Sequence, residues 1–330
     1  MRVRYSVVIP IRDEEETLAE LYRRLSAVLE TLDAPWELIL VDDGSVDGSH
    51  PVMLALRERD ARVKIVRLSR NFGHQVAITA GLDRSSGDAV IVMDGDLQHP
   101  PEVIPELVER WQAGFDVVYG VMAERHGETR FKRWTARVFY RLLGRLSEVD
   151  VPAAGDFRLV DRKAADAFGS LRERSRYLRG MFSWIGFRQT GVRYSAPPRY
   201  AGRSKYTFPR MAQLGANGIL SFSRKPLRLV LVLGFFVSAL AIAEAVYAVV
   251  DKVGGFNTAP GWASLVLVVS GLGGIQLIVL GVIGEYVGLV YEEVKRRPIY
   301  VVSELHGFEP VAESEPEPAA TVRSAPGPGP

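Results

Sequence analysis

The stretch YSVVIPIRDEEETLAELYRRLSAVLETLDAPWELILVDDGS, from Tyr5 to Ser45, decides the fold class. It opens with a short apolar run, continues with a charged, helix-like segment, and closes with a second apolar run that ends in two aspartates. Short apolar runs that are bounded by polar residues are typical of buried strands. The stretch therefore predicts a strand–helix–strand unit.

The same alternation continues to about residue 120. Two further apolar runs, at 63–69 and 88–96, are predicted strands, and 50–60 and 71–85 are predicted helices. Strands that alternate with helices favour an open, largely parallel α/β sheet. Ligands of such sheets bind beyond the carboxyl ends of the strands. The residues that we expect at those ends are Pro10, Asp42, Asp43, Asp94 and Asp96.

The composition of the 330-residue chain excludes several classes of protein. A net charge of +2 gives no reason to expect a nucleic-acid partner, and the absence of cysteine excludes disulfides and thiolate zinc sites. A mean hydropathy of +0.05 is high for a chain with 24% charged residues. Polar and very apolar regions must therefore coexist.

Two apolar runs, at 229–250 and 262–283, account for this hydropathy. Each is long enough to cross a bilayer as a helix, which takes about 20 residues. Their short link predicts a transmembrane hairpin; two buried core helices are the alternative. Because basic residues flank the hairpin on its outer sides, the domain before the hairpin and both termini are expected to be cytoplasmic, in a multi-pass protein of the cell membrane. These flanking residues are Arg224, Lys225, Arg228, Lys295, Arg296 and Arg297.

Two stretches of the chain mix basic and aromatic residues, at 127–147 and 206–223. They predict helices that lie in the membrane interface, the alternative being amphipathic helices packed on the sheet. A tail rich in proline, alanine and glutamate is expected to be disordered. The predicted order is a cytoplasmic domain at 1–226, the hairpin at 227–291, a cytoplasmic segment at 292–309 and the tail at 310–330.

Asp94 and Asp96 end a predicted strand in the sequence DGD. Buried carboxylates need a compensating cation, and oxygen ligands suit Mg²⁺ or Mn²⁺. Gln98 offers a third oxygen, and Gly95 permits close approach of the backbone. Since magnesium shares its coordination with substrate phosphates, the pattern anticipates a diphosphate. A solvated acidic turn is the alternative.

Asp42 and Asp43 end the preceding strand of the Tyr5–Ser45 unit. A carboxylate at such a position can accept hydrogen bonds from a nucleobase or a ribose, and we assign that contact to Asp43. Ser45 or Asp47 is expected to cap the next helix. The chain has neither a GxGxxG motif after its first strand nor a phosphate-binding P-loop, which argues against dinucleotide-dependent dehydrogenases and P-loop enzymes.

Five motifs occur in order along the chain: VVIPIRDEEETL, LVDDGSVDGS, LSRNFGHQVAITAGLDRSSGDAVIVMDGDLQHPPEVIPELV, GDFRLVDRKA and RYAGRSKY. Together they resemble the motifs of the family 2 glycosyltransferases of the polyprenyl-phosphate type, a group that includes dolichol-phosphate mannose synthase. The resemblance runs from about Tyr5 to Tyr300, and it implies a GT-A-like domain that binds a nucleotide sugar.

The resemblance also implies roles for individual residues. The positions that match nucleotide-sugar contacts are Pro10, Arg12, Glu14, Val41, Asp43, Met93, Asp94 and Gly95; those that match the metal site are Asp94, Asp96 and Gln98; and those that match phosphate contacts are Arg199 and Lys205. The chain departs from the family at Arg12-Asp13, where relatives read Tyr-Asn, and at Met122, where many carry an arginine that Arg125 is a candidate to replace.

The implied reaction moves one sugar, with inversion, from a nucleoside diphosphate sugar to polyprenyl phosphate. A UDP-hexose is the favoured donor and GDP-mannose the alternative. A phosphate monoester has a second pKa of about 6 and is therefore largely a dianion at neutral pH. The acceptor consequently needs no general base. Asp156 and Arg158 are the candidate catalytic pair, with Asp156 expected to hold Arg158, the sugar or the acceptor in place.

Other expectations are less specific. His74 and His99 are expected not to be catalytic. The small-residue run SGLGGIQLIVLG, at 270–281, favours close helix packing and homo-oligomers. The alternative functions are a membrane glycosyltransferase with another lipid or glycan acceptor and a non-catalytic scaffold that binds nucleotide sugars.

Overall fold

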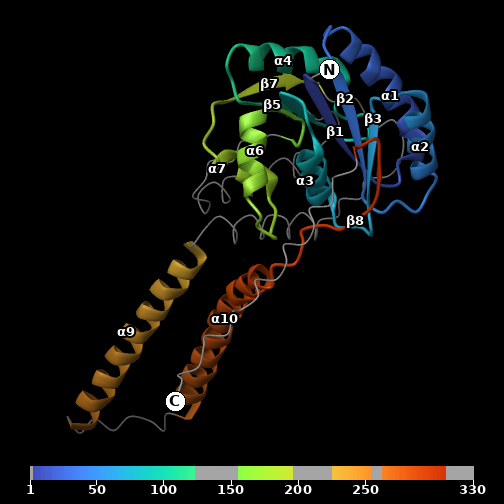
Figure 1. The fold of residues 1–330 in the computed structure, drawn as a ribbon. Helices are drawn as coiled ribbons and strands as arrows, with labels where there is room; N and C mark the ends of the chain where they lie inside the picture. The colour runs from blue at the N-terminus through green and yellow to red at the C-terminus, as the bar shows by residue number, and fades with distance from the viewer. Residues whose placement is uncertain (1–2, 123–154, 196–224, 254–261, 310–330) are drawn as a thin grey trace, which may run out of the picture.

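The computed structural model describes residues 3–122, 155–195, 225–253 and 262–309. In this part of the chain an eight-stranded sheet has the strand order β7-β5-β6-β4-β1-β2-β3-β8, and two long helices extend from it (Figure 1). The elements are β1 (Tyr5–Ile11), α1 (Glu15–Glu30), β2 (Trp36–Asp42), α2 (Ser49–Arg59), β3 (Val63–Leu68), α3 (His74–Arg84), β4 (Ala89–Val92), a 3-10 turn η1 (Pro101–Val103), α4 (Ile104–Gln112), β5 (Val117–Met122), β6 (Arg158–Asp161), α6 (Arg162–Ser170), α7 (Leu178–Trp184), β7 (Gln189–Tyr194), α9 (Lys225–Val253), α10 (Trp262–Val294) and β8 (Val302–His306).

The first four strands are mutually parallel, as the alternating sequence pattern predicts. All seven residues of β1 are buried because helices cover both faces of the sheet. α1, α2 and α4 pack on one face, and α3, α6 and α7 pack on the other. The open α/β sheet expected of a GT-A-like domain is therefore confirmed.

The remaining strands extend the sheet at both sides. β6 lies between β4 and β5 and is antiparallel to both, and β7 is parallel to β5. At the opposite edge β8 pairs antiparallel with β3, with a register shift between Arg67 and Leu68. The predicted cytoplasmic segment 292–309 thus supplies an edge strand to the sheet, which the sequence alone did not indicate.

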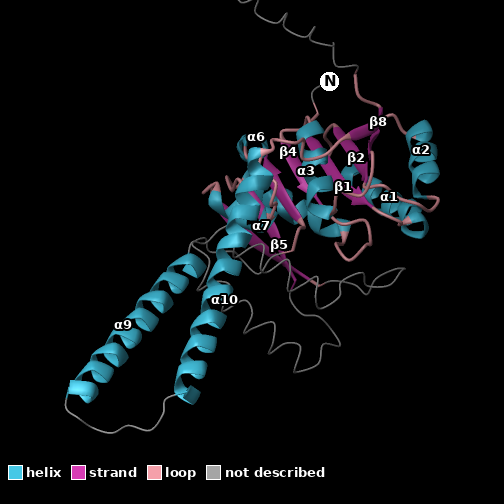
Figure 2. Ribbon diagram, turned by 90° about the horizontal axis from the view of Figure 1, so that it is seen from below, coloured by secondary structure: helices cyan, strands magenta, loops and turns pink. Residues whose placement is uncertain are grey.

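α9 and α10 leave the sheet domain together and point away from it (Figures 1 and 2). Within the described residues one segment, Gly271–Val294 in α10, is long and apolar enough to cross a membrane. In α9 the apolar stretch Val230–Ala243 is shorter than a span. The predicted second run ended at 283, whereas α10 continues to Val294. The two-span hairpin consequently remains a prediction.

The predicted interfacial helices at 127–147 and 206–223 and the predicted tail at 310–330 lie outside the described residues.

Candidate active site

The carboxyl ends of three adjacent strands carry the candidate site. β1 pairs with β2 on one side and with β4 on the other, all in parallel register. The segments that leave these strands therefore meet at one edge of the sheet, as the sequence predicted. They begin at Arg12 after β1, at Asp43 after β2 and at Met93 after β4.

The turn after β4 holds the carboxylate pair in a constrained shape. Leu97 has a φ of 60° although its side chain is buried, a conformation that non-glycine residues rarely adopt and that is concentrated at functional sites. The N–H of Gln98 donates to Oδ1 of Asp96 over 3.0 Å. A Cβ on Gly95 would lie 2.8 Å from Cδ1 of Ile11. A larger residue at position 95 would therefore have to displace the end of the Ile11 side chain.

The main chain of Asp94 is fixed by a hydrogen bond, whereas one oxygen of its carboxylate accepts no hydrogen bond from the described residues. Its N–H donates to Nδ1 of His99 over 2.9 Å. The His99 ring is buried and stacks on Phe157 with centroids 5.1 Å apart. Within the described residues, Oδ1 of Asp94 is buried and has no hydrogen bond. Such an oxygen, beside the nearly buried Asp96, fits a divalent cation.

The buried carboxylate of Asp156 lies close to that of Asp94, with His74 between them. Nε2 of His74 is 3.3 Å from Oδ1 of Asp94 and 3.5 Å from Oδ2 of Asp156. The other oxygen of Asp156 is 3.2 Å from Nε of Arg179 and 3.4 Å from a terminal nitrogen of Arg158. Asp156 thus joins the turn after β4 to the start of β6 and to α7.

These contacts fix the charges in the site. Burial opposes the charged form of Asp156, but the positive charges of Arg179 and His74 outweigh it and hold the pKa of Asp156 well below its usual range. Burial likewise opposes the imidazolium, yet Asp94 and Asp156 raise the pKa of His74 to about 9. Burial lowers the pKa of Arg158 to about 10. At neutral pH Asp156 is therefore an anion that is poorly suited to act as a general base.

His74 and Arg179 are the two residues that the sequence did not place in the site. For His74 a signal was present, because it stands in the NFGHQ part of a quoted motif and begins α3. Arg179 had no such signal. Its position depends on how α7 packs across the sheet, which no local pattern reveals.

The carboxylate of Asp43, which we predicted to contact a nucleobase or a ribose, is bound instead by main-chain N–H groups of the protein. Its carboxylate accepts hydrogen bonds from the N–H groups of Phe72 and Gly73 over 2.7 and 3.0 Å. Burial raises the pKa of Asp43, and these two N–H donors act against that rise. The side chain is 3% exposed. Asp43 therefore anchors the loop before α3, and its contact with a nucleotide remains a prediction.

Arg12 and Asp13 tie the end of β1 to the neighbouring loop. A terminal nitrogen of Arg12 donates to the carbonyl of Asp43 over 3.2 Å. Asp13 has a φ of 53°, and its N–H donates to Oγ of Ser45 over 3.1 Å. The departure from the family at these two positions thus has a structural role.

The capping prediction for α2 holds only in part. The helix is preceded by Gly48, which provides no side-chain cap. Oδ1 of Asp47 accepts from the N–H of Ser49 over 3.0 Å. Ser45 does not cap, because its hydroxyl instead accepts from the Asp13 N–H of the neighbouring loop.

The remaining predicted residues are placed as follows. The N–H of Glu14 donates to Oγ of Ser49 over 2.8 Å, beside the same loop. The predicted residues Pro10, Val41 and Met93 are buried, and their contact with a nucleotide sugar remains a prediction. Those that lie outside the described residues are Arg125, Arg199 and Lys205.

Comparisons with known proteins agree with this geometry. Residues 6–169 match the family described as Glycosyl transferase family 2. The chain is 44% identical over 310 residues to an uncharacterized glycosyltransferase of Synechocystis sp., covering 94% of this chain and 98% of that one. It is 38% identical over 309 residues to the bactoprenol glucosyl transferase of Shigella phage SfII, covering 93% and 100%.

Among solved structures, the glucosyl-3-phosphoglycerate synthase of Mycobacterium tuberculosis in complex with Mn²⁺, UDP-glucose and phosphoglyceric acid is similar with a TM-score of 0.45 and 20% identity. That similarity covers 66% of this chain and 78% of the synthase.

An open α/β sheet with paired carboxylates beyond its central strands is an architecture suited to enzymes that handle nucleoside diphosphates. On the strength of the full-length relatives, the chain belongs to glycosyl transferase family 2, and it is a glycosyltransferase.

Proposed function

We propose that the protein transfers a single sugar, with inversion, from a nucleoside diphosphate sugar to polyprenyl phosphate at the cytoplasmic face of the membrane. A UDP-hexose is the donor that we favour. The observation that carries the proposal is the Asp94–Asp96 pair, in a sheet whose edge strand β8 follows a helix apolar enough to cross a bilayer. The relative named as a bactoprenol glucosyl transferase supports the acceptor.

In this proposal Asp94, Asp96 and Gln98 hold a divalent cation, Mg²⁺ or Mn²⁺. The buried Oδ1 of Asp94, which accepts no hydrogen bond within the described residues, fits that role. The cation would neutralise the charge that develops on the departing diphosphate. Arg199 and Lys205 are proposed to contact the same phosphates.

Asp156 acts as a positioning residue in this scheme. The acceptor phosphate is largely a dianion at neutral pH and attacks the anomeric carbon without losing a proton, because its second pKa is about 6. The ionised Asp156 keeps Arg158 and Arg179 within 3.4 Å of its carboxylate. Two guanidinium groups are thereby fixed beside the turn that carries Asp94, where they add positive charge before the reaction begins.

The base and ribose of the donor are proposed to lie over the ends of β1 and β2. Arg12, Glu14 and Asp43 surround this position, and Pro10, Val41 and Met93 form its floor. Gly95 leaves room for the backbone to approach the diphosphate, since a Cβ at that residue would contact Ile11.

The membrane arrangement is also part of the proposal: two spans at about 229–250 and 262–283, homo-oligomers, and a catalytic domain in the cytoplasm. A groove of about 920 Å³ at the end of α10 supports this orientation. Five arginines and only two carboxylates contribute to its lining. Basic residues next to a span favour the cytoplasmic side and its anionic headgroups. The arginines are Arg84, Arg172, Arg174, Arg296 and Arg297.

A lipid-product assay tests the proposal. Membranes that contain the protein receive polyprenyl phosphate, Mg²⁺ or Mn²⁺, and either a UDP-sugar or a GDP-sugar. Mass spectrometry of the extracted lipid is expected to show one glycosylated phospholipid with one donor, absent from membranes with the Asp96→Ala variant. If folded protein gives no new lipid with any donor, the acceptor is wrong.

A further inference from the structure

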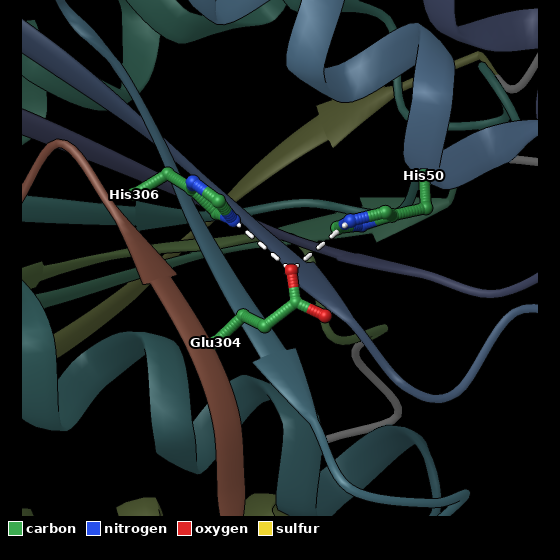
Figure 3. A group of neighbouring side chains, drawn as sticks. All are labelled: His50, Glu304 and His306. Carbon is green, nitrogen blue, oxygen red and sulfur yellow. Dashed lines mark hydrogen bonds and ion pairs between the residues drawn. The ribbon is translucent and has the colours of Figure 1, made fainter.

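A second group of potential metal ligands lies at the opposite side of β2, away from Asp94. Figure 3 shows His50 from α2 meeting Glu304 and His306 from β8. Nε2 of His50 and Nε2 of His306 lie 3.4 and 3.2 Å from the same carboxylate oxygen of Glu304. One ligand atom from each of the three residues lies within 4.8 Å of the other two.

These separations are those of ligands around a small metal ion. Bonds of about 2.0–2.1 Å in a tetrahedral site place neighbouring ligand atoms roughly 3.3 Å apart. The two distances to Glu304 already have that value. Because residues two apart in a strand point to the same side, Glu304 and His306 face His50 together.

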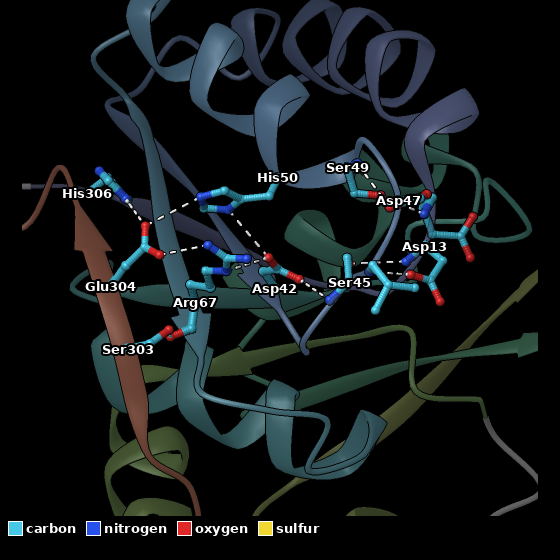
Figure 4. Close-up of polar contacts among 12 residues, drawn as sticks. Asp13, Asp42, Ser45, Asp47, Ser49, His50, Arg67, Ser303, Glu304 and His306 are labelled. Atoms are coloured by element: carbon cyan, nitrogen blue, oxygen red, sulfur yellow. Dashed lines mark hydrogen bonds and ion pairs between the residues drawn. The ribbon is translucent and has the colours of Figure 1, made fainter.

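Buried atoms behind His50 provide a second, independent observation. Nδ1 of His50 lies 3.4 Å from Oδ2 of Asp42. Both atoms are buried, and neither has a hydrogen bond within the described residues. A metal on Nε2 would leave the proton of the neutral ring on Nδ1, which then points at Asp42 (Figure 4). Carboxylate–histidine–metal arrangements of this kind orient ligands in many metal sites.

The charges of the cluster also suit a cation. Asp42 and Glu304 are acidic and Arg67 is basic, so with neutral imidazoles the cluster carries a net negative charge. Arg67 donates to Oε1 of Glu304 over 2.7 Å, and its Nε lies 3.5 Å from Asp42. Oε1 is thus taken by Arg67, while Oε2 is the oxygen that faces both histidines.

We propose that His50, Glu304 and His306 form a site for a divalent transition-metal ion, with zinc the best match to two imidazoles and one carboxylate. The site differs in chemistry from the all-oxygen ligand set proposed at Asp94. Glu304 and His306 are 39% and 35% exposed at their side chains, so the fourth ligand position faces solvent and takes water.

The position of this site gives it a mechanical role. One ligand comes from α2, early in the chain, and two come from β8, the strand that follows α10. The ion therefore fastens the segment after the membrane helix to the helix that follows β2. Asp42, which contacts His50, directly precedes Asp43, the residue that anchors the loop before α3. The inference concerns only this metal site, and it does not depend on which sugar or acceptor the enzyme uses.

Zinc content and cobalt spectra of the purified full-length protein in detergent test the inference. After a chelator has removed bound metal and excess Mg²⁺ has been added to saturate the oxygen site, the wild type is expected to bind about one zinc ion per chain when zinc is supplied. Co²⁺ in its place is expected to give the intense visible absorption of a tetrahedral ion. Zinc is expected to raise the melting temperature by several degrees.

Variants separate this site from the active site. His306→Ala and His50→Ala are expected to lose the bound zinc and the zinc-dependent rise in melting temperature. Asp96→Ala and His74→Ala, which change the active site, are expected to retain both. The inference is overturned if the wild type binds no stoichiometric zinc, if its Co²⁺ spectrum is the weak one of an octahedral ion, or if folded His306→Ala and His306→Gln proteins keep the zinc.

Discussion

Nε2 of His74 lies 3.3 Å from Oδ1 of Asp94, so an imidazole stands beside the carboxylate oxygen that otherwise lacks a hydrogen bond in the described residues. The same ring nitrogen reaches Asp156, 3.5 Å away. His74 therefore links the carboxylate proposed to bind metal with the carboxylate that holds the site arginines. Its charge state bears on both.

The stability contributed by His74 is expected to depend on pH. Its pKa rises to about 9 in the folded protein, above the ordinary value of about 6.5. The charged form of His74 therefore stabilises the folded protein. This stabilisation is fully present at pH values below the pKa of the unfolded state, and it is lost as the pH rises through 9. In metal-free buffer, His74→Gln is expected to cost roughly 1–2 kcal/mol at pH 6, after allowance for solvent screening, and less at pH 9.5.

Chemical denaturation at these two pH values, followed by circular dichroism, measures the difference. An equal cost at both would show that His74 is not charged in the folded protein.

The metal-binding role of Asp96 predicts a large loss of activity on substitution. Asp96→Asn keeps the shape of the side chain and its acceptor for the Gln98 N–H, but it removes the charge that a cation needs. Transfer of sugar to lipid is expected to fall about 100-fold or more, with partial recovery at high Mn²⁺. Asp88→Asn, before the start of β4, is the matched control and is expected to keep full activity. If Asp96→Asn and Asp88→Asn had similar activity, Asp96 would not be a ligand of the metal.

Asp156 is predicted to position arginines and not to accept a proton. Because its pKa lies well below the usual range, wild-type turnover should show no ionisation of Asp156 between pH 6 and 8. Asp156→Asn should lower turnover about tenfold or more through misplaced Arg158 and Arg179, without changing the shape of the pH profile. A profile whose acid limb disappears in Asp156→Asn would identify a general base instead.

Gly95 is predicted to be restricted by a single neighbour. Gly95→Ala would place a Cβ 2.8 Å from Cδ1 of Ile11, and such overpacking typically costs about 1–3 kcal/mol. Ile11→Val removes that methyl group. The double variant is expected to be more stable than the sum of the two single effects by about 1 kcal/mol, measured by denaturant unfolding. Simple additivity would mean that the two positions are not in contact.

Much of the fold could be predicted because, up to β4, local sequence patterns indicate each strand and helix. β1 to β4 are short apolar runs between polar residues, and α1 to α3 follow the predicted ranges closely. β8 could not be predicted. Its five residues, VSELH, alternate between half-buried and exposed, and they become a strand only by pairing with β3, more than 230 residues earlier.

The residues of the candidate site can also be divided into those that local sequence patterns indicate and those that depend on contacts between distant elements. Asp94, Asp96 and Asp156 could be proposed from the sequence because their positions in motifs or at strand ends are local. Arg179 and the surroundings of Asp43 depend on contacts between distant elements, such as the loop before α3 that closes on Asp43. Ser45 illustrates a choice between a local and a distant partner, in which the N–H of Asp13, on the neighbouring loop, prevails over the first turn of α2.

The position of β8 has a consequence for how the protein is made. Translation produces β1 to β7 before α9 and α10, and β8 follows both helices. Until then the edge of β3 has unpaired main-chain groups, a state prone to wrong pairing with other chains. Synthesis of the helices thus falls between the start and the completion of one sheet. A chain that ends within α10 would contain β1 to β7 but would leave the edge of β3 open.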